Sequence, residues 1–352
     1  MRVAQALWMP ERRRFLRWTG AGLAVVGAPM VRSQTGAERN RVTVTVAGGL
    51  SLANLPLSVA LHRGFFGQEG LDVDFVESLD EAQSLQAFLS GGTELVCGPY
   101  EQTMRLQARG KPGVAFVMLA RVPKVVFGIS TRKHATLRAL TDFRGQLVGY
   151  GGAGTTSELV ARQVLSRAGL RPNEVQWQAV ADAVTGLHGV RSGQLDAWCN
   201  GDPAMTQLEQ RSEVRVLSDT RTLRGTAELF GGPMPGLCLY ATSAFLQRNP
   251  RHAQALANAV VHALRWLQTA GPRDLVRTLP ERMFLGDRAV YLAALAKNQE
   301  GFSTDGVLAE DGAWTALRHL AANDPEVRLG RIDLSQTWSG SFALRAREQF
   351  RL

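Results

Sequence analysis

A glycine-rich segment near the middle of the chain contains residue types that suit the binding of an anion. In "LVGYGGAGTTSE" (residues 147–158), Gly149, Gly151 and Gly154 fit the pattern G-x-G-x-x-G, and a helical pattern begins at about Thr155. Glycines let backbone N–H groups approach a ligand closely, and the N-terminus of the following helix favours negative charge. The segment therefore predicts a site for a phosphate, sulfonate, nitrate or carboxylate group.

The same glycine pattern also occurs in proteins that bind dinucleotides, which leaves a nucleotide as a second interpretation. That fingerprint requires an acidic residue at the end of the next strand, where it binds the ribose hydroxyls. Asp182 follows the next predicted strand, although it comes later than the usual spacing. The motif alone leaves both ligands open.

Further candidate ligand residues follow predicted strands, because small-molecule sites gather at the carboxyl ends of parallel strands. The hydroxyls of Thr155 and Thr156 are expected either to cap a helix or to bind ligand oxygens, and Tyr100 either packs or stacks on the ligand. Asp202 precedes Pro203, so it either caps a helix or accepts a hydrogen bond from a ligand amine. The complete set of predicted ligand-binding residues is Ser51, Leu52, Asn54, Gly98, Tyr100, Gly154, Thr155, Thr156, Asn200 and Asp202.

Composition argues against several other functions. The formal net charge is +9, of which residues 1–33 contribute +5, and the remainder has no run of Lys or Arg, so no nucleic-acid partner is expected. Cys97, Cys199 and Cys238 each lie in an apolar run and are predicted to be small buried side chains. No spacing of His, Cys or acidic residues indicates a metal site or a catalytic cluster, so we expect no cofactor, no metal ion and no catalytic residue.

The N-terminus has the pattern of an export signal. Arg12 and Arg13 open "RRRFLR", which fits the twin-arginine motif, and an uncharged segment runs from Trp18 to Val31. That segment is shorter than the roughly 20 apolar residues of a membrane-spanning helix. We therefore expect residues 1–33 to be a cleaved signal peptide and the rest of the chain to be periplasmic.

The hydrophobic pattern after residue 40 alternates between short strands and helices. One series of strands and helices runs from residue 41 to 122, and a second begins near residue 124 and ends near residue 219. "GLCLYATSAF" (236–245) predicts one more strand, and the pattern from Asn249 to Asn323 is nearly all helical. This order predicts an α/β protein of two lobes, each a mostly parallel sheet covered by helices, with a cleft between them.

Five segments of the chain follow one another in an order and spacing that is typical of a known family: "PLSVALHRGFFGQEGLDVDFVE", "FLSGGTELVCG", "LTDFRGQLVGYGGAGTTSE", "VRSGQLDAW" and "ATSAFLQRNPRHAQALANAVVHALRWLQ". In these segments the sequence resembles the substrate-binding proteins of nitrate, sulfonate and taurine ABC transporters (NMT1/THI5-like proteins). Glu94 stands where the family usually has Asp. The resemblance covers nearly all of residues 41–300.

This resemblance implies a periplasmic binding protein type II fold, hinged around a ligand cleft and extended by C-terminal helices. Lobe 1 would comprise residues 41–122 and 236–352, and lobe 2 residues 123–235. A monomer of this kind would capture a small anion, such as an aliphatic sulfonate, taurine or nitrate, and deliver it to an ABC permease and its ATPase. The glycine segment would then open the second lobe and bind no nucleotide.

Two relatives of this scaffold suggest alternatives. One type binds or makes the pyrimidine of thiamine, and another is a desulfinase with a nucleophilic cysteine after the first strand. Here the segment between the first strand and the first helix has no cysteine, and no cluster of cysteines occurs in the chain. A sensor for a membrane partner is a third alternative, which the sequence does not distinguish from a transport protein.

Overall fold

The computed structural model describes residues 40–49, 51–133, 137, 139–180, 182–284 and 286–350. The predicted signal peptide, residues 1–33, lies outside the described residues. Within the described part of the chain, no helix is both long enough and apolar enough to cross a membrane.

The first sheet has five strands in the order β2-β1-β3-β10-β4. Its strands are β1 (Arg41–Ala47), β2 (Asp72–Ser78), β3 (Leu95–Pro99), β4 (Gly113–Met118) and β10 (Leu237–Thr242). Strand β1 pairs in parallel with β2 and β3, whereas β10 pairs antiparallel with both β3 and β4. The chain therefore returns to its first sheet after it has built the second one.

The second sheet repeats this arrangement, in the order β7-β6-β8-β5-β9. Its strands are β5 (Val126–Ser130), β6 (Leu147–Tyr150), β7 (Gln176–Ala179), β8 (Ala197–Asn200) and β9 (Val214–Asp219). Here β5 is antiparallel to its neighbours β8 and β9, while β6 is parallel to β7 and β8. In each sheet the antiparallel strand is thus the one that arrives from the other sheet.

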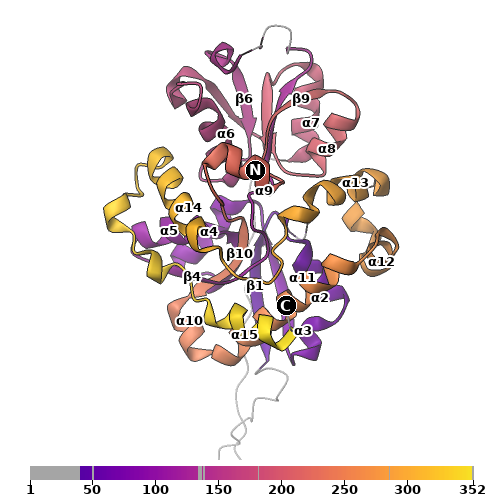
Figure 1. Cartoon of the computed structure of the whole chain (residues 1–352), viewed down its shortest axis with the longest axis vertical. Helices are drawn as coiled ribbons and strands as arrows, with labels where there is room; N and C mark the ends of the chain where they lie inside the picture. The colour runs from indigo at the N-terminus through magenta and orange to yellow at the C-terminus, as the bar shows by residue number, and fades with distance from the viewer. Residues whose placement is uncertain are drawn as a thin grey trace, which may run out of the picture. The chain divides into compact units, whose positions relative to one another are not determined.

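Helices cover both sheets (Figure 1). Those of the two strand–helix series are α2 (Leu55–His62), α3 (Phe65–Gln68), α4 (Glu81–Ser90), α5 (Gln102–Ala108), α6 (Thr156–Ser166), α7 (Ala183–Ser192), α8 (Ala204–Gln210) and α9 (Leu223–Phe230). The later helices are α10 (Ser243–Arg248), α11 (Pro250–Thr269), α12 (Pro272–Thr278), α13 (Arg288–Asn298), α14 (Glu310–Asn323) and α15 (Ser341–Phe350). The short 3-10 helices are η1 (Leu140–Phe143), η2 (Pro172–Glu174), η3 (Glu281–Phe284), η4 (Gln299–Gly301), η5 (Leu329–Arg331) and η6 (Leu334–Gln336). The predicted α/β architecture is confirmed.

Two details of the helices differ from the sequence prediction. The apolar spacing in "LANLPLSVALHRGFF" predicts one continuous helix, but α2 ends at His62, and α3 begins only after Gly64, whose φ of 72° is left-handed. Helix α9 was not predicted at all. Its start is stabilised by Thr222, whose hydroxyl accepts a hydrogen bond from the N–H of Gly225.

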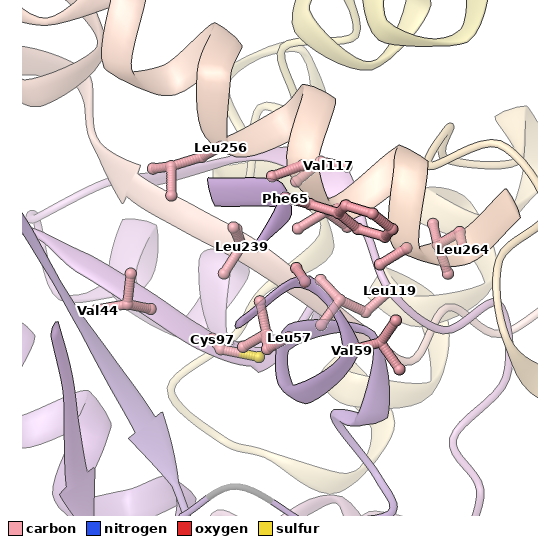
Figure 2. Close-up of a cluster of buried hydrophobic side chains, with 14 of the residues drawn as sticks. Val44, Leu57, Val59, Phe65, Cys97, Val117, Leu119, Leu239, Leu256 and Leu264 are labelled. Carbon is pink, nitrogen blue, oxygen red and sulfur yellow. The ribbon is translucent and has the colours of Figure 1, made fainter. Parts of the chain in front are cut away.

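The core of the first sheet forms where the long helix α11 packs against the strands and against α2. Figure 2 shows Leu256 and Leu264 of α11 together with Leu57 of α2 and Leu239 of β10 in one apolar cluster, and all four side chains are almost completely buried. Each such burial stabilises the fold by about 1.5–3 kcal/mol. This packing fixes the ends of β1 and β3, where the candidate site lies.

The two crossings between the sheets touch each other at Gly236. The Gly236 N–H donates to the carbonyl of Ala120 at 3.1 Å, and a Cβ at Gly236 would lie 2.1 Å from the carbonyl oxygen of Val122. Because the clashing atom belongs to the backbone, the neighbour cannot rotate away. Only glycine lets the two chain segments approach this closely.

We expect Gly236→Ala to lower the free energy of unfolding by about 1–3 kcal/mol or more, because the crossings must separate to accept the methyl group. Urea unfolding measures this loss. Gly67→Ala is the matched control, since a Cβ there meets nothing within 4 Å. An equal effect of the two substitutions would contradict a close approach at Gly236.

Candidate functional site

A cavity of about 370 Å³ lies between residues of the first and the second sheet. Its wall is formed largely by the N-terminal ends of helices that follow strands: α2 and α4 from the first series, and α6, α7 and α8 from the second. Such ends concentrate free N–H groups and positive dipoles, which suits a polar or anionic ligand. A volume of this size is typical of small-molecule sites.

Six of the ten predicted ligand residues line this cavity: Leu52, Asn54, Thr155, Thr156, Asn200 and Asp202. Asn54 is only 2% exposed, and its amide is already used within its own loop. Its Oδ1 accepts from the N–H of Ser51 at 2.9 Å, and its Nδ2 donates to the carbonyl of Gly49 at 2.8 Å. Asn54 therefore shapes the wall more than it offers hydrogen bonds to a ligand.

The other four predicted residues are not on the wall. The N–H of Ser51 donates to the side chain of Asn54, and Gly98 lies within β3 against the ring of Tyr240. Tyr100 is fully buried, and its hydroxyl bonds to that of Thr337 at 2.7 Å, so it is packed in the core and does not face a ligand. The carbonyl of Gly154 accepts from side chains of α5. The sequence places these residues at strand ends, but the direction of each side chain depends on tertiary packing.

The N–H groups of the glycine segment are largely bonded within the chain. The Gly151 N–H donates to Ser157 Oγ at 2.8 Å, and the Gly154 N–H donates to Glu158 Oε2 at 2.7 Å. Thr155 caps α6 through its hydroxyl, which accepts from the Glu158 N–H, so the capping interpretation is confirmed. Asp182, the candidate ribose acceptor, caps α7 by accepting from the N–H and hydroxyl of Thr185. These contacts do not favour a nucleotide.

A carboxylate of the first series occupies the N-terminus of α6. Glu81 Oε2 accepts from the Thr156 N–H at 2.6 Å and from its hydroxyl at 3.2 Å, and the same hydroxyl lies 2.9 Å from Glu101 Oε1. Burial, together with the neighbouring charge of Glu101, raises the pKa of Glu81 to about 7. Burial also raises the pKa of Glu101. Two carboxyl groups thus contact the same hydroxyl, that of Thr156. Their raised pKa values favour a protonated carboxyl group at this contact.

Asp202 belongs to a buried ionic cluster. Its Oδ1 caps α8 by accepting from the Thr206 N–H at 2.7 Å, while its Oδ2 accepts from Arg221 at 3.1 Å and from the Asn298 amide at 2.6 Å. The Asp202 side chain is 1% exposed. Both carboxylate oxygens therefore have partners in the chain, and Asp202 stabilises the start of α8 from the position before its N-cap residue, Pro203.

Lys124 is a wall residue that the sequence analysis missed. Among the described residues it is the one Lys or Arg on the cavity wall, and it is 4% exposed. Burial lowers its pKa well below the usual value, although Asp202 opposes this effect. The signal in the sequence is a single charge inside the apolar run "VPKVVFGIS". Asp80 and Glu81 were also missed, although they directly follow a predicted strand.

The chemistry of the wall does not indicate covalent catalysis or metal binding. Cys97 lines the cavity, but burial raises the pKa of its thiol to about 12, so a reactive thiolate is disfavoured. The three cysteines are buried, as predicted, and the structure shows them as free thiols. In the described part of the chain, no group of three or more His, Cys, Asp or Glu residues could hold a metal ion.

A family model described as "NMT1/THI5 like" matches residues 53–270. The chain belongs to this family. The match begins just before α2 and ends with α11, so it includes most of the residues that line the cavity, while Ala47, Gly48, Leu52 and Asn298 lie outside it.

Two of the solved structures that share the fold illustrate the range of similarity. One, from Bordetella bronchiseptica RB50, is 38% identical, with a TM-score of 0.84, and the alignment covers 90% of this chain and 99% of that one. Another is the alkanesulfonate-binding protein SsuA from Xanthomonas axonopodis pv. citri, bound to MOPS. It is 16% identical, with a TM-score of 0.65, and the coverage is 86% of this chain and 99% of that one. The chain has the periplasmic binding protein fold, as the resemblance implied.

A curated relative of a different kind is the 4-amino-5-hydroxymethyl-2-methylpyrimidine phosphate synthase of Schizosaccharomyces pombe. It is 23% identical over 239 residues, which are 63% of this chain and 64% of that protein. The proteins to which this chain is similar therefore include an enzyme as well as a binding protein.

Proposed function

We propose that this chain is the periplasmic solute-binding component of an ABC importer and that its ligand is a small organic anion, such as an aliphatic sulfonate. The observation that carries the proposal is the cavity of about 370 Å³, whose wall combines helix N-termini from both strand–helix series. A nitrate ion would fill only a small part of this volume. The size therefore favours an organic solute over an inorganic ion.

The proposed mechanism is closure of two lobes on the ligand. Residues 41–122 and 236–352 would form lobe 1, and residues 123–235 lobe 2, because the strands of each stretch build one sheet. Contacts such as Glu81 with Thr156 and Asn298 with Asp202 then link the lobes. The closed monomer would dock on a membrane permease with its ATPase, after export of the chain and removal of residues 1–33. The export route, by the twin-arginine signal, is part of the proposal.

The proposed ligand contacts are fewer than the sequence suggested. Asn200 offers a polar side chain on the wall, and Leu52 offers an apolar one. Thr156 also lines the wall, but its hydroxyl donates to Glu101 or Glu81, so it is free only to accept from a ligand. Thr155 and Asp202 are engaged in capping, so we assign them to support of the wall. We leave Ser51, Gly98, Tyr100 and Gly154 out of the proposed site, because they do not line the cavity.

A thermal-shift screen of the purified protein tests this function. A ligand at a hundredfold excess over its Kd should stabilise the fold by about 2.7 kcal/mol. We expect stabilisation by short alkanesulfonates or taurine, and little by nitrate. Calorimetry with the compound that stabilises most should then give one site per chain. The absence of stabilisation by every anion tested would contradict the proposed ligand class.

The alternative ligand is a pyrimidine of the thiamine pathway, which the relationship to the pyrimidine phosphate synthase keeps open. The same screen therefore includes 4-amino-5-hydroxymethyl-2-methylpyrimidine, and stabilisation by this compound alone would support that alternative. An enzyme of the desulfinase type is less favoured, because the pKa of Cys97 on the cavity wall is raised.

A further inference from the structure

We propose that the Nζ of Lys124 is the group that recognises the anionic head of the ligand. Lys124 lies in the first crossing between the sheets, directly before β5. Its side chain is buried, yet in the described part of the chain its Nζ has no hydrogen-bond partner. The inference rests on the proposed function and names the residue and the charge that would select the ligand.

The backbone holds Lys124 in an unusual conformation at the cavity. Its φ of 62° is left-handed, which is uncommon for a residue other than glycine, and its N–H donates to the carbonyl of Thr220 at 3.0 Å. Residues held in such conformations are often found at ligand sites. The crossing therefore fixes the start of the Lys124 side chain on the wall.

The side chain runs between Gly301 and the ring of Phe302. A Cβ at Gly301 would lie 3.2 Å from Lys124 Cε, so glycine leaves room for the lysine, and Nζ lies 2.9 Å from the centroid of the Phe302 ring. An aromatic face attracts an ammonium group but supplies no hydrogen-bond acceptor. The N–H groups of Lys124 therefore have no hydrogen-bond acceptor in the described part of the chain, and a ligand oxygen could supply one.

The neighbouring carboxylate of Asp202 does not serve as the hydrogen-bond partner of Lys124. Asp202 is the charged group that acts most strongly on Lys124, but its oxygens already accept from Thr206, Arg221 and Asn298. The Asp202 charge is shared with Arg221, at 3.1 Å. A buried amine without a partner is costly, and an anionic oxygen would remove that cost by pairing with it.

The carboxylates on the wall make this assignment specific. Asp182 caps α7, and Glu81 bonds to Thr156 at the start of α6, so these two acidic groups disfavour an anion near those helix ends. Lys124 is the one Lys or Arg on the described wall, so it is the position where the negative head of a ligand could pair with an ammonium group. The anionic head is therefore placed at the crossing and not at the glycine segment.

Binding of a charged ligand and of its neutral analogue tests the proposal. Calorimetry of the full chain with butanesulfonate and butanesulfonamide compares two ligands of similar shape that differ in charge. We expect Lys124→Met to weaken butanesulfonate binding roughly ten- to hundredfold, and to change sulfonamide binding much less. Lys297→Met is the matched control, because that lysine pairs with Glu209 and does not line the cavity.

The stability of the ligand-free variant is a second readout. Methionine fills a similar volume without a buried amine, so Lys124→Met should unfold at the same temperature as the wild type or at a higher one. A structural lysine would give the opposite result, and a lower melting temperature with unchanged sulfonate affinity would overturn the inference. If the wild-type protein itself binds neither compound, the proposed function fails together with the anion site. If the wild type binds and the variant binds equally well, only the role of Lys124 fails.

Discussion

Replacing Arg221 with methionine is expected to lower the free energy of unfolding by about 3–5 kcal/mol, since removal of one partner leaves buried charges without compensation. The Arg221 side chain is 2% exposed, and its guanidinium bonds to Asp219 through two nitrogens, at 2.9 and 2.5 Å. It also contacts Asp202 at 3.1 Å and Glu209 at 2.9 Å. Burial alone would lower the pKa of Arg221, but its acidic partners outweigh burial and raise the pKa above its usual value.

Urea unfolding measures the effect of Arg221→Met, and two further variants define its cause. Arg224→Met removes an arginine that is 89% exposed and pairs with Glu228 on the surface of α9, where we expect a change within about 1 kcal/mol. The double variant Arg221→Met with Asp202→Asn removes one of the stranded charges, so it should be less destabilised than the sum of the single variants. Equal losses for Arg221→Met and Arg224→Met would show that burial of the ionic cluster is unimportant.

The elements of the fold could be predicted because the hydrophobic pattern is local. Alternation in "RVTVTVA" and the apolar run in "GVAFVMLA" both became strands, β1 and β4. The ends of the predicted strands also indicated the region of the site. Consecutive strand–helix units place the carboxyl ends of their parallel strands at the same edge of the sheet, where ligands bind. This reasoning placed Thr156 and Asn200 on the cavity wall.

The contents of the site were harder to predict, because they depend on contacts between residues far apart in the chain. Tyr100 comes directly after β3, and Asn200 is the last residue of β8, yet Tyr100 packs inward and bonds to Thr337, 237 positions later. The N–H of Thr156 is taken by Glu81, 75 positions earlier. No local pattern distinguishes a free helix N-terminus from one that a distant carboxylate already occupies.

The contact between Glu81 and Thr156 predicts how stability depends on pH. The pKa of Glu81 is raised to about 7 in the folded chain, from the 4.5 of an unperturbed glutamate, because the carboxyl group is buried next to Glu101. Because the folded state holds this proton more tightly, the group contributes its full stabilisation at pH values below its pKa in the unfolded chain. That stabilisation is lost as the pH rises toward and through its pKa in the folded chain. Stability should therefore fall between about pH 4.5 and 7, by up to about 3 kcal/mol for Glu81 alone.

Glu81→Gln should remove most of this fall. Glutamine keeps an oxygen that can accept from the Thr156 N–H, but it carries no charge next to Glu101. We expect the variant to resemble the wild type at low pH and to be the more stable protein above about pH 7. The pKa of Glu101 is also raised, so a smaller slope of the same sign should persist. Urea unfolding across this pH range measures both curves.

Glu348→Gln is the control for the loss of one carboxylate, because Glu348 is exposed on α15. It should leave the slope of the wild type unchanged. If Glu81→Gln also leaves that slope unchanged, Glu81 is ionised in the folded chain at neutral pH, and the α6 N-terminus stabilises its charge instead of a proton. The slope of the Glu81→Gln variant therefore distinguishes a protonated Glu81, which shares its proton with Glu101, from an ionised Glu81 that caps α6. The hydrogen bonds of Glu81 are compatible with both states.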